Sequence, residues 1–425
     1  MDFWSIINLN QFITMTVEKS KLKNSVRILN IDLPDSLSTT ILIMVKAGSR
    51  YESPKENGIA HFIEHIIFKG SEKYPDPKTV SYQIECLGGQ TNAFTSEEYT
   101  GYYIKCANEN FAKAFDILSD MFLNPLFDEK ELTKEKGVVI EEIRMYEDQP
   151  EVKVGENFQS EMFNGDHLGQ PITGPIENIS DFSHEMVMNF RNRLYTGSNV
   201  VIAIAGKLDK VMVNEKIQIF ESIPETGKSY FEVSNKKFSY PNDIIKKEVN
   251  QTHLVYGTYA LKSEDPDREK LKVASMVLGG GMGSELTLKL REELGIAYYA
   301  DAFENSFEDR GLMGVSAGVD STKINQALDA IKAVIENLKS GPIPAESLLR
   351  AKELLKSYYT LDFESSDNVA NFLGLRETVL GSYRLPSEII DKINKVTVED
   401  VHEMTKRIWE QDTHLSVITN SDLEI

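Results

Sequence analysis

The sequence predicts an α+β protein built from two similar α/β domains. Short apolar runs that are typical of buried strands alternate with helical patterns along the whole chain. A stretch near the midpoint, residues 221–247, combines prolines, a glycine and many polar residues with weak periodicity, as a linker between domains does. The flanking halves then repeat one order of elements, which indicates a duplicated domain.

The first half sets this order. Residues 39–45 form an apolar run that is predicted to be a strand, and residues 59–70 are predicted to be a helix that ends at a glycine. Two further helices are predicted over residues 111–123 and 128–145, joined by a turn that contains a proline. Residues 199–205 are continuously apolar and are predicted to be another buried strand.

The second half repeats the pattern with a strand over residues 252–258 and helices over 270–281, 324–338 and 345–359. We therefore expect an N-terminal extension over residues 1–14, a first domain over 15–222, a linker over 223–246 and a second domain over 247–425. Aligning residues 128–145 on residues 344–361 places Ala351 opposite Glu135 and Tyr358 opposite Glu142.

Composition narrows the class of partner. The 46 Lys and Arg against 66 Asp and Glu give a formal net charge of −20, which argues against a nucleic acid or an anionic membrane as partner. Such a chain attracts basic peptides, but the charge taken alone favours the simpler interpretation that it confers solubility. The two cysteines, Cys86 and Cys106, are interpreted as free thiols in a reducing compartment. No apolar run approaches the roughly 18 residues of a membrane helix, and the N-terminus is a poor signal peptide, so we expect a cytoplasmic protein.

The predicted helix over residues 59–70 carries the chemistry. It is apolar almost all round and should be buried, yet it contains His61, Glu64 and His65. Because a buried carboxylate without a partner is costly, these groups need compensation. His61 and His65 are four residues apart and share one helical face, so their imidazoles can bind one Zn²⁺. Glu64 lies beside them and can take a proton from the attacking water.

The pattern His-x-x-Glu-His is specific, since composition alone gives roughly 0.02 such matches per chain. It is the inverted zinc-peptidase signature. A catalytic zinc needs a third protein ligand, and the predicted helix over residues 128–145 offers Glu135, Glu141 and Glu142. Glu135 and Glu142 are two turns apart on one face, but periodicity does not choose between Glu141 and Glu142. The alternative is a solvated acidic helix face.

The sequence resembles the M16 family of inverzincin zinc metallopeptidases, which includes pitrilysin, insulysin and the mitochondrial processing peptidases, and it is most similar to the short-chain branch. The resemblance rests on residues 61–70, on Gly88-Gly89-Gln90-Thr91-Asn92-Ala93-Phe94-Thr95, on residues 145–150 and 168–174, and on residues 278–282 and 290–298. It implies that the third ligand is Glu142, because 76 residues lie between His65 and Glu142. It also implies that Glu135 supports the site without binding the metal.

The resemblance also implies the fold and the other site residues. The expected fold is that of the LuxS and processing-peptidase metallohydrolases, with two homologous domains that form half of a clamshell and one Zn²⁺ per chain in the first domain. Arg291 and Tyr298 would assist from the second domain, with Tyr298 as a donor to the developing oxyanion. Asn92 and Ala93 would offer a sheet edge to an extended peptide. The structural alternatives are a surface arginine, a core tyrosine and an ordinary hairpin strand.

The function expected from these residues is zinc-dependent hydrolysis of unfolded peptides or extended precursor segments in an enclosed chamber, with His61, His65 and Glu142 as ligands and Glu64 as general base. The substrates could be cationic. Chains of this length in the family usually pair, which implies a homodimer or a heterodimer with a related chain. Two alternatives remain: a non-catalytic peptide-binding or structural subunit, and a metal hydrolase for a substrate that is not a peptide.

Overall fold

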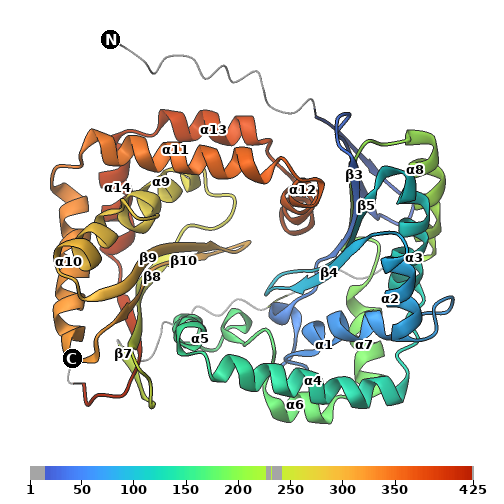
Figure 1. Cartoon of the computed structure of the whole chain (residues 1–425), viewed down its shortest axis with the longest axis horizontal. Coiled ribbons are helices and arrows are strands. Elements are labelled where there is room, and N and C mark those ends of the chain that lie inside the picture. The colour runs from blue at the N-terminus through green and yellow to red at the C-terminus, as the bar shows by residue number, and fades with distance from the viewer. Residues whose placement is uncertain (1–14, 226–230, 232–241, 424–425) are drawn as a thin grey trace. The chain divides into compact units, whose positions relative to one another are not determined.

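The computed structural model describes residues 15–225, 231 and 242–423. The chain folds into two compact units (Figure 1). The first comprises Met1–Val139, Ile172–Phe231 and Thr360–Tyr383, and the second comprises Ile140–Pro171, Glu232–Tyr359 and Arg384–Ile425. The boundary at residue 139 falls inside one continuous helix, α4 (Glu129–Glu147), so residues on either side of it are held by a single element.

The first unit is built on a six-stranded sheet. Its strand order is β1-β2-β6-β3-β5-β4, and all neighbours are antiparallel except β2 and β6, which are parallel. The apolar runs predicted as strands form its centre, where every residue of β6 is buried. Strand β4 lies at an edge, and its pairing in the described structure is with β5 alone. The strands are β1 (Thr16–Lys21), β2 (Arg27–Asp32), β3 (Ser38–Val45), β4 (Gln90–Thr95), β5 (Thr100–Ala107) and β6 (Val200–Gly206).

The second unit repeats this topology. Its five-stranded sheet has the order β7-β11-β8-β10-β9, in which β7 and β11 are parallel and the other pairs are antiparallel. Strand for strand, this is the order β2-β6-β3-β5-β4 with the same pairing directions, which confirms the predicted duplication. The strands are β7 (Asn242–Lys246), β8 (Thr252–Ala260), β9 (Ala297–Ser306), β10 (Gly311–Val319) and β11 (Thr413–Thr419).

Each sheet is covered on one face by helices of its own half. In the first unit α1 and α3 pack on this face, and in the second α9, α10 and α14 do so. The helices of the first half are α1 (Ile59–Ile66), α2 (Pro77–Glu85), α3 (Phe111–Leu123), α4, α5 (Pro150–Met162), α6 (Ile176–Asp181), α7 (His184–Leu194) and α8 (Lys210–Lys216). Those of the second half are α9 (Arg268–Gly279), α10 (Ile324–Ser340), α11 (Ala345–Asp362), α12 (Ser366–Leu380), α13 (Pro386–Lys395) and α14 (Val398–Trp409).

The opposite face of each sheet is covered by a helix from the other half of the sequence. Helix α12 packs against β3 and β6 of the first sheet, where Val369 and Leu373 join a core with Leu42 and Ala203 (Figure 1). Helix α5 packs in the same way against the second sheet. Gly374 permits the close approach of α12, because a Cβ added there would lie 3.3 Å from the Cβ of Ala203.

This exchange explains why the two compact units differ from the two continuous domains expected over residues 15–222 and 247–425. Helices α5 and α12 each bury apolar side chains against the sheet of the other half. The predicted extension, residues 1–14, and residues 226–230 and 232–241 of the predicted linker lie outside the described residues. No helix among the described residues has the length and apolar character needed to cross a membrane.

Candidate metal centre

Helix α1 is anchored at its start by a buried carboxylate. The side chain of Glu52, which is fully buried, accepts hydrogen bonds from the backbone N–H groups of Gly58 and Ala60 at 2.8 Å each and from Asn57 Nδ2 at 2.9 Å. Gly58 adopts a φ of 98°, a conformation that favours glycine. Burial raises the pKa of Glu52 to about 7, although these hydrogen bonds act to lower it.

The two histidines of α1 turn the same nitrogen atoms toward each other. The Nε2 atoms of His61 and His65 are 3.2 Å apart, and Glu142 on α4 completes the group. One ligand atom from each of the three residues lies within 4.8 Å of the other two, and among the described residues no other group of His, Cys, Asp or Glu is arranged in this way. His61 is buried, and the other two are partly exposed. A ligand set of this kind leaves room for a water or a substrate atom.

The donor set and its spacing fit zinc. Two ligands at about 2.0–2.1 Å from a tetrahedral ion lie roughly 3.3 Å from each other, close to the Nε2–Nε2 separation of His61 and His65. Two imidazoles and one carboxylate are also a ligand set found in catalytic zinc sites. These three residues are therefore the ones that would hold the ion.

Adjacent glutamates on α4 point in different directions. Glu142 lies with the two histidines, whereas Glu141 is exposed and accepts a hydrogen bond from Arg144 Nη1 at 2.6 Å. Helical periodicity alone did not choose between these two residues. The orientation of α4 against α1 distinguishes them.

Glu135 contacts His65 on the side of the ring that faces away from His61. Its Oε1 is 2.9 Å from His65 Nδ1, and its Oε2 is 2.7 Å from Lys69 Nζ. Burial acts to raise the pKa of this carboxyl, but the hydrogen bonds from His65 and Lys69 outweigh it, and the pKa lies below its ordinary value. An ionised Glu135 fixes His65 so that Nε2, rather than Nδ1, faces His61.

Glu64 is held from the edge strand. Thr95 at the end of β4 donates a hydrogen bond from its hydroxyl to Glu64 Oε2 at 2.6 Å. Glu64 is partly exposed and directly precedes His65 on α1, so its carboxylate can meet a water near the ligands. The contact also ties the general-base candidate to the strand that carries Asn92 and Ala93.

The remaining predicted residues lie on two other elements. Asn92 is exposed and Ala93 partly exposed on β4, the edge strand. Arg291 lies in a π-helical segment (Thr287–Glu293), where its Nη1 is 3.6 Å from Met282 Sδ and its Nε is 3.8 Å from Glu292 Oε1. Tyr298 at the start of β9 is 73% exposed, so it is not the core aromatic of the structural alternative.

Sequence reasoning missed three residues that support the site: Glu52, Lys69 and Thr95. Lys69 had a usable signal, because it follows His65 by four residues and so continues the same helical face. Thr95 and Glu52 had none, since only the folded chain brings Thr95 to Glu64 and Glu52 to the first turn of α1.

Two family models match the chain in succession. Residues 27–176 match the model described as insulinase, peptidase family M16, and residues 181–355 match the model described as the peptidase M16 inactive domain. The first match contains all the residues of the candidate metal centre, and the second begins after it.

Curated relatives match over almost the whole chain. An uncharacterized zinc protease of Bacillus subtilis is 33% identical over 405 residues, which cover 95% of this chain and 98% of the relative. An uncharacterized zinc protease of Rickettsia bellii is 31% identical and covers the same shares. The beta subunit of the mitochondrial-processing peptidase of Dictyostelium discoideum is 29% identical, over 86% of this chain and 81% of that subunit.

Solved structures share the fold. A protease from Helicobacter pylori superposes with a TM-score of 0.88 at 21% identity, covering 95% of this chain and 99% of that one. A Pseudomonas fluorescens structure titled peptidase M16 inactive domain gives the same TM-score at 17% identity, with 96% and 100% covered. With the successive matches to both M16 models and the near full-length zinc protease relatives, the chain belongs to peptidase family M16.

Proposed function

We propose that this chain is a zinc-dependent endopeptidase that hydrolyses unfolded peptides or extended precursor segments. The observation that carries the proposal is the convergence of His61, His65 and Glu142 on one point beside Glu64. A zinc ion bound there would polarise the scissile carbonyl and lower the pKa of the attacking water towards about 7. The named relatives that are zinc proteases support this class of chemistry.

Each side chain near the proposed zinc ion has a different role in the proposed reaction. Glu64 accepts the proton of the attacking water and then passes it to the leaving amine, and the hydrogen bond from Thr95 orients its carboxylate for both transfers. Glu135 holds His65 in position through Nδ1. From the family resemblance alone, we propose that Tyr298 donates to the developing oxyanion and that Arg291 assists it, and the exposed side chain of Tyr298 is available for such a role.

The substrate would bind as an added strand. Strand β4 is a sheet edge whose outer backbone groups are unpaired in the described structure. It also carries Thr95, which donates a hydrogen bond to Glu64. An extended peptide can hydrogen-bond to such an edge through its main chain, which gives affinity with little demand on sequence. We therefore propose Asn92 and Ala93 as the positions that bind the peptide backbone. The net charge of −20 favours cationic peptides among the possible substrates.

A second chain is part of the proposal. Three relatives are named as beta subunits of mitochondrial-processing peptidases, and this chain covers 77–88% of their length. We propose that the chain works as a homodimer or with a related chain that closes a chamber around the peptide. The rival proposal is a non-catalytic subunit, and the complete metal-ligand set argues against it.

The deciding experiment compares the wild type, Glu64→Gln and chelator-treated protein on quenched fluorescent peptides that are unfolded and basic. We expect the wild type to cleave, the other two to lose activity, and added zinc to restore only the chelated protein. Metal analysis should find about one zinc per chain in both the wild type and Glu64→Gln. Equal cleavage by all three would contradict the mechanism, and stable peptide binding without cleavage by the zinc-loaded wild type would favour the rival.

A further inference from the structure

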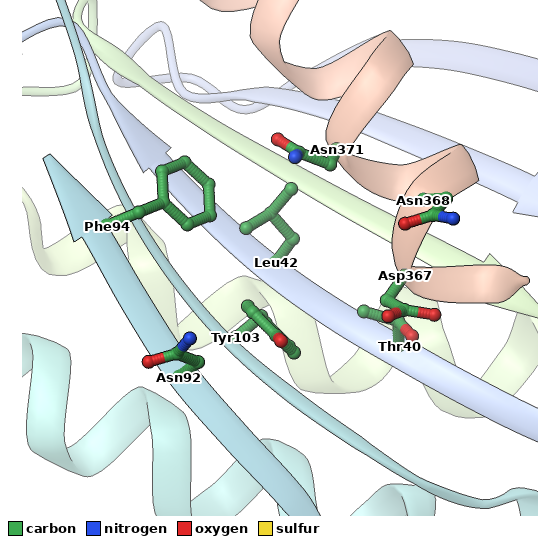
Figure 2. A pocket seen from close by; sticks show the side chains of 8 residues that line it. All are labelled: Thr40, Leu42, Asn92, Phe94, Tyr103, Asp367, Asn368 and Asn371. Carbon is green, nitrogen blue, oxygen red and sulfur yellow. The ribbon is translucent and has the colours of Figure 1, made fainter. Parts of the chain in front are cut away.

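The edge strand β4 has two faces with different surroundings. Thr95 points to the face that carries α1, where it contacts Glu64. Asn92 and Phe94 point to the opposite face, since successive side chains of a strand alternate. On that face they line the same pocket as residues of helix α12, with residues of β5 and β3 between them (Figure 2). A peptide added to the edge would likewise send alternate side chains to the two faces.

A pocket of about 160 Å³ lies on the α12 face. Figure 2 shows side chains from three strands and the helix around it: Asn92 and Phe94 of β4, Tyr103 of β5, Thr40 and Leu42 of β3, and Asp367, Asn368 and Asn371 of α12. Its volume is close to that of an engineered cavity, about 150 Å³, that admits benzene. It is therefore large enough for the end of one amino-acid side chain.

A glycine shapes the floor of the pocket. Gly101 of β5 lies opposite Phe94, and a Cβ added to it would come within 2.3 Å of the Phe94 ring. Because glycine is present, the ring lies across β5 and exposes an aromatic surface beside Tyr103 and Leu42. The floor can thus contact the apolar part of a bound side chain.

The polar groups of the pocket carry almost no uncompensated charge. Asp367 is its charged lining residue, and its Oδ1 accepts hydrogen bonds from Lys105 Nζ, at 2.7 Å, and from the Ser365 hydroxyl. The side-chain amides of Asn92, Asn368 and Asn371 make no hydrogen bond with any residue that the structure describes, and all three are exposed. Each amide therefore offers both a donor and an acceptor to a ligand.

We propose that this pocket is a subsite that selects a neutral, amide-bearing side chain, glutamine above all, in a peptide bound along β4. The inference rests on the proposed function, since it assumes a peptide on that edge. The aromatic floor packs against the methylene groups of the glutamine, and the unpaired asparagine amides exchange donor and acceptor with its terminal amide. A lysine or glutamate would enter without a free counter-ion, because Asp367 and Lys105 already pair with each other.

The test uses Glu64→Gln, which should bind peptides without cleaving them. Unfolded host peptides carry Gln, Met, Lys or Glu at one position, and that position is moved along the host one residue at a time. Dissociation constants are measured by fluorescence anisotropy. We expect the Gln peptide to bind about five- to tenfold more tightly than the Met peptide at one position, with no preference at its immediate neighbours, which face α1.

Variants of the helix locate the effect. In the Glu64→Gln background, Asn368→Leu with Asn371→Leu should bring the Gln-to-Met ratio close to one, and Asn371→Asp should shift the preference from Gln to Lys. Asn305→Leu is the matched control, because Asn305 is an exposed asparagine on β9, the equivalent edge strand of the second sheet, and it should keep the preference. Circular dichroism checks that each variant is folded.

The outcomes separate this proposal from the proposed function. If the Gln preference is absent, occurs equally at adjacent positions, or survives the double Leu variant, the subsite is overturned. If Glu64→Gln binds none of the peptides, it is overturned as well. If the preference is found but the zinc-loaded wild type cleaves none of the peptides, the subsite stands and the peptidase proposal fails.

Discussion

The two halves of the chain share a topology but differ in what their equivalent helices carry. Helix α4 carries Glu135 and Glu142 toward the histidines of α1, whereas α11 carries Ala351, which is fully buried, and Tyr358, which is 49% exposed, at the matching positions. Helix α9, the counterpart of α1, contains no histidine. The same topology therefore forms without these polar groups, and the proposed metal site gives a reason for their presence in the first half.

The largest expected effect comes from removing a ligand. His65→Ala should lose bound zinc and lower peptide hydrolysis by at least about 10³-fold, because the metal that polarises the carbonyl is no longer held. Its matched control is Tyr358→Ala, at the position of α11 that corresponds to Glu142, the proposed ligand on α4. Metal analysis and initial rates are the measurements. Loss of zinc from Tyr358→Ala would show that the halves are not distinct in the way described.

The next effect concerns the start of α1. Glu52→Gln should destabilise the protein by up to about 3 kcal/mol at low pH, since the new amide nitrogen faces backbone N–H groups that need an acceptor. The pKa of Glu52 is raised to about 7, so its stabilising contribution is complete below its ordinary pKa near 4.5 and is lost as the pH rises through 7.

The measurement is thermal denaturation of both proteins between pH 4.5 and 8. The difference in unfolding free energy should shrink as the pH rises, because the penalty for a charged, buried Glu52 grows only in the wild type. A constant difference across this range would mean that Glu52 does not titrate there. Helix α9 begins differently: the Asp267 side chain makes no capping hydrogen bond, and Asp265 Oδ1 accepts a hydrogen bond from the Asp267 backbone N–H at 3.0 Å.

A smaller loss of zinc affinity is expected when Glu135, the residue that contacts His65, is changed. Glu135→Gln should reduce zinc affinity about 10–100-fold, the usual effect of removing the carboxylate that orients a liganding histidine. The Gln variant keeps the size of the side chain, and its amide can still contact either His65 or Lys69. Competition with a calibrated chelator measures the affinity. A full loss of zinc, equal to that of His65→Ala, would indicate that Glu135 is itself a ligand.

Local pattern predicted much of this arrangement. The expected helix over residues 59–70 is observed as α1 followed by a 3-10 turn (Ile67–Lys69), and the helix over 111–123 matches α3. These elements are governed by spacing within one segment. The duplication was also visible, because both halves repeat the same order of strands and helices.

Contacts between distant segments were not predictable in the same way. Helix α12 is only weakly amphipathic, and nothing in its own sequence indicates that Val369 and Leu373 pack on the first sheet. Thr95 reaches Glu64 only because β4 pairs with β5 and lies beside α1. Periodicity within one segment does not show which residue from a distant segment will contact it, so such contacts could not be predicted from the sequence.

The smallest expected effect tests the finest difference, that between adjacent glutamates on α4. Glu141→Ala removes an exposed carboxylate whose pairing with Arg144 is solvent-accessible, and such pairs contribute little. We expect its unfolding free energy to change by less than about 0.5 kcal/mol, with zinc affinity unchanged. Glu142→Ala, one residue later, should lose the metal because Glu142 lies with His61 and His65. Calorimetric titration of both variants with zinc decides the matter: equal losses would mean that α4 presents an acidic face and not a single ligand.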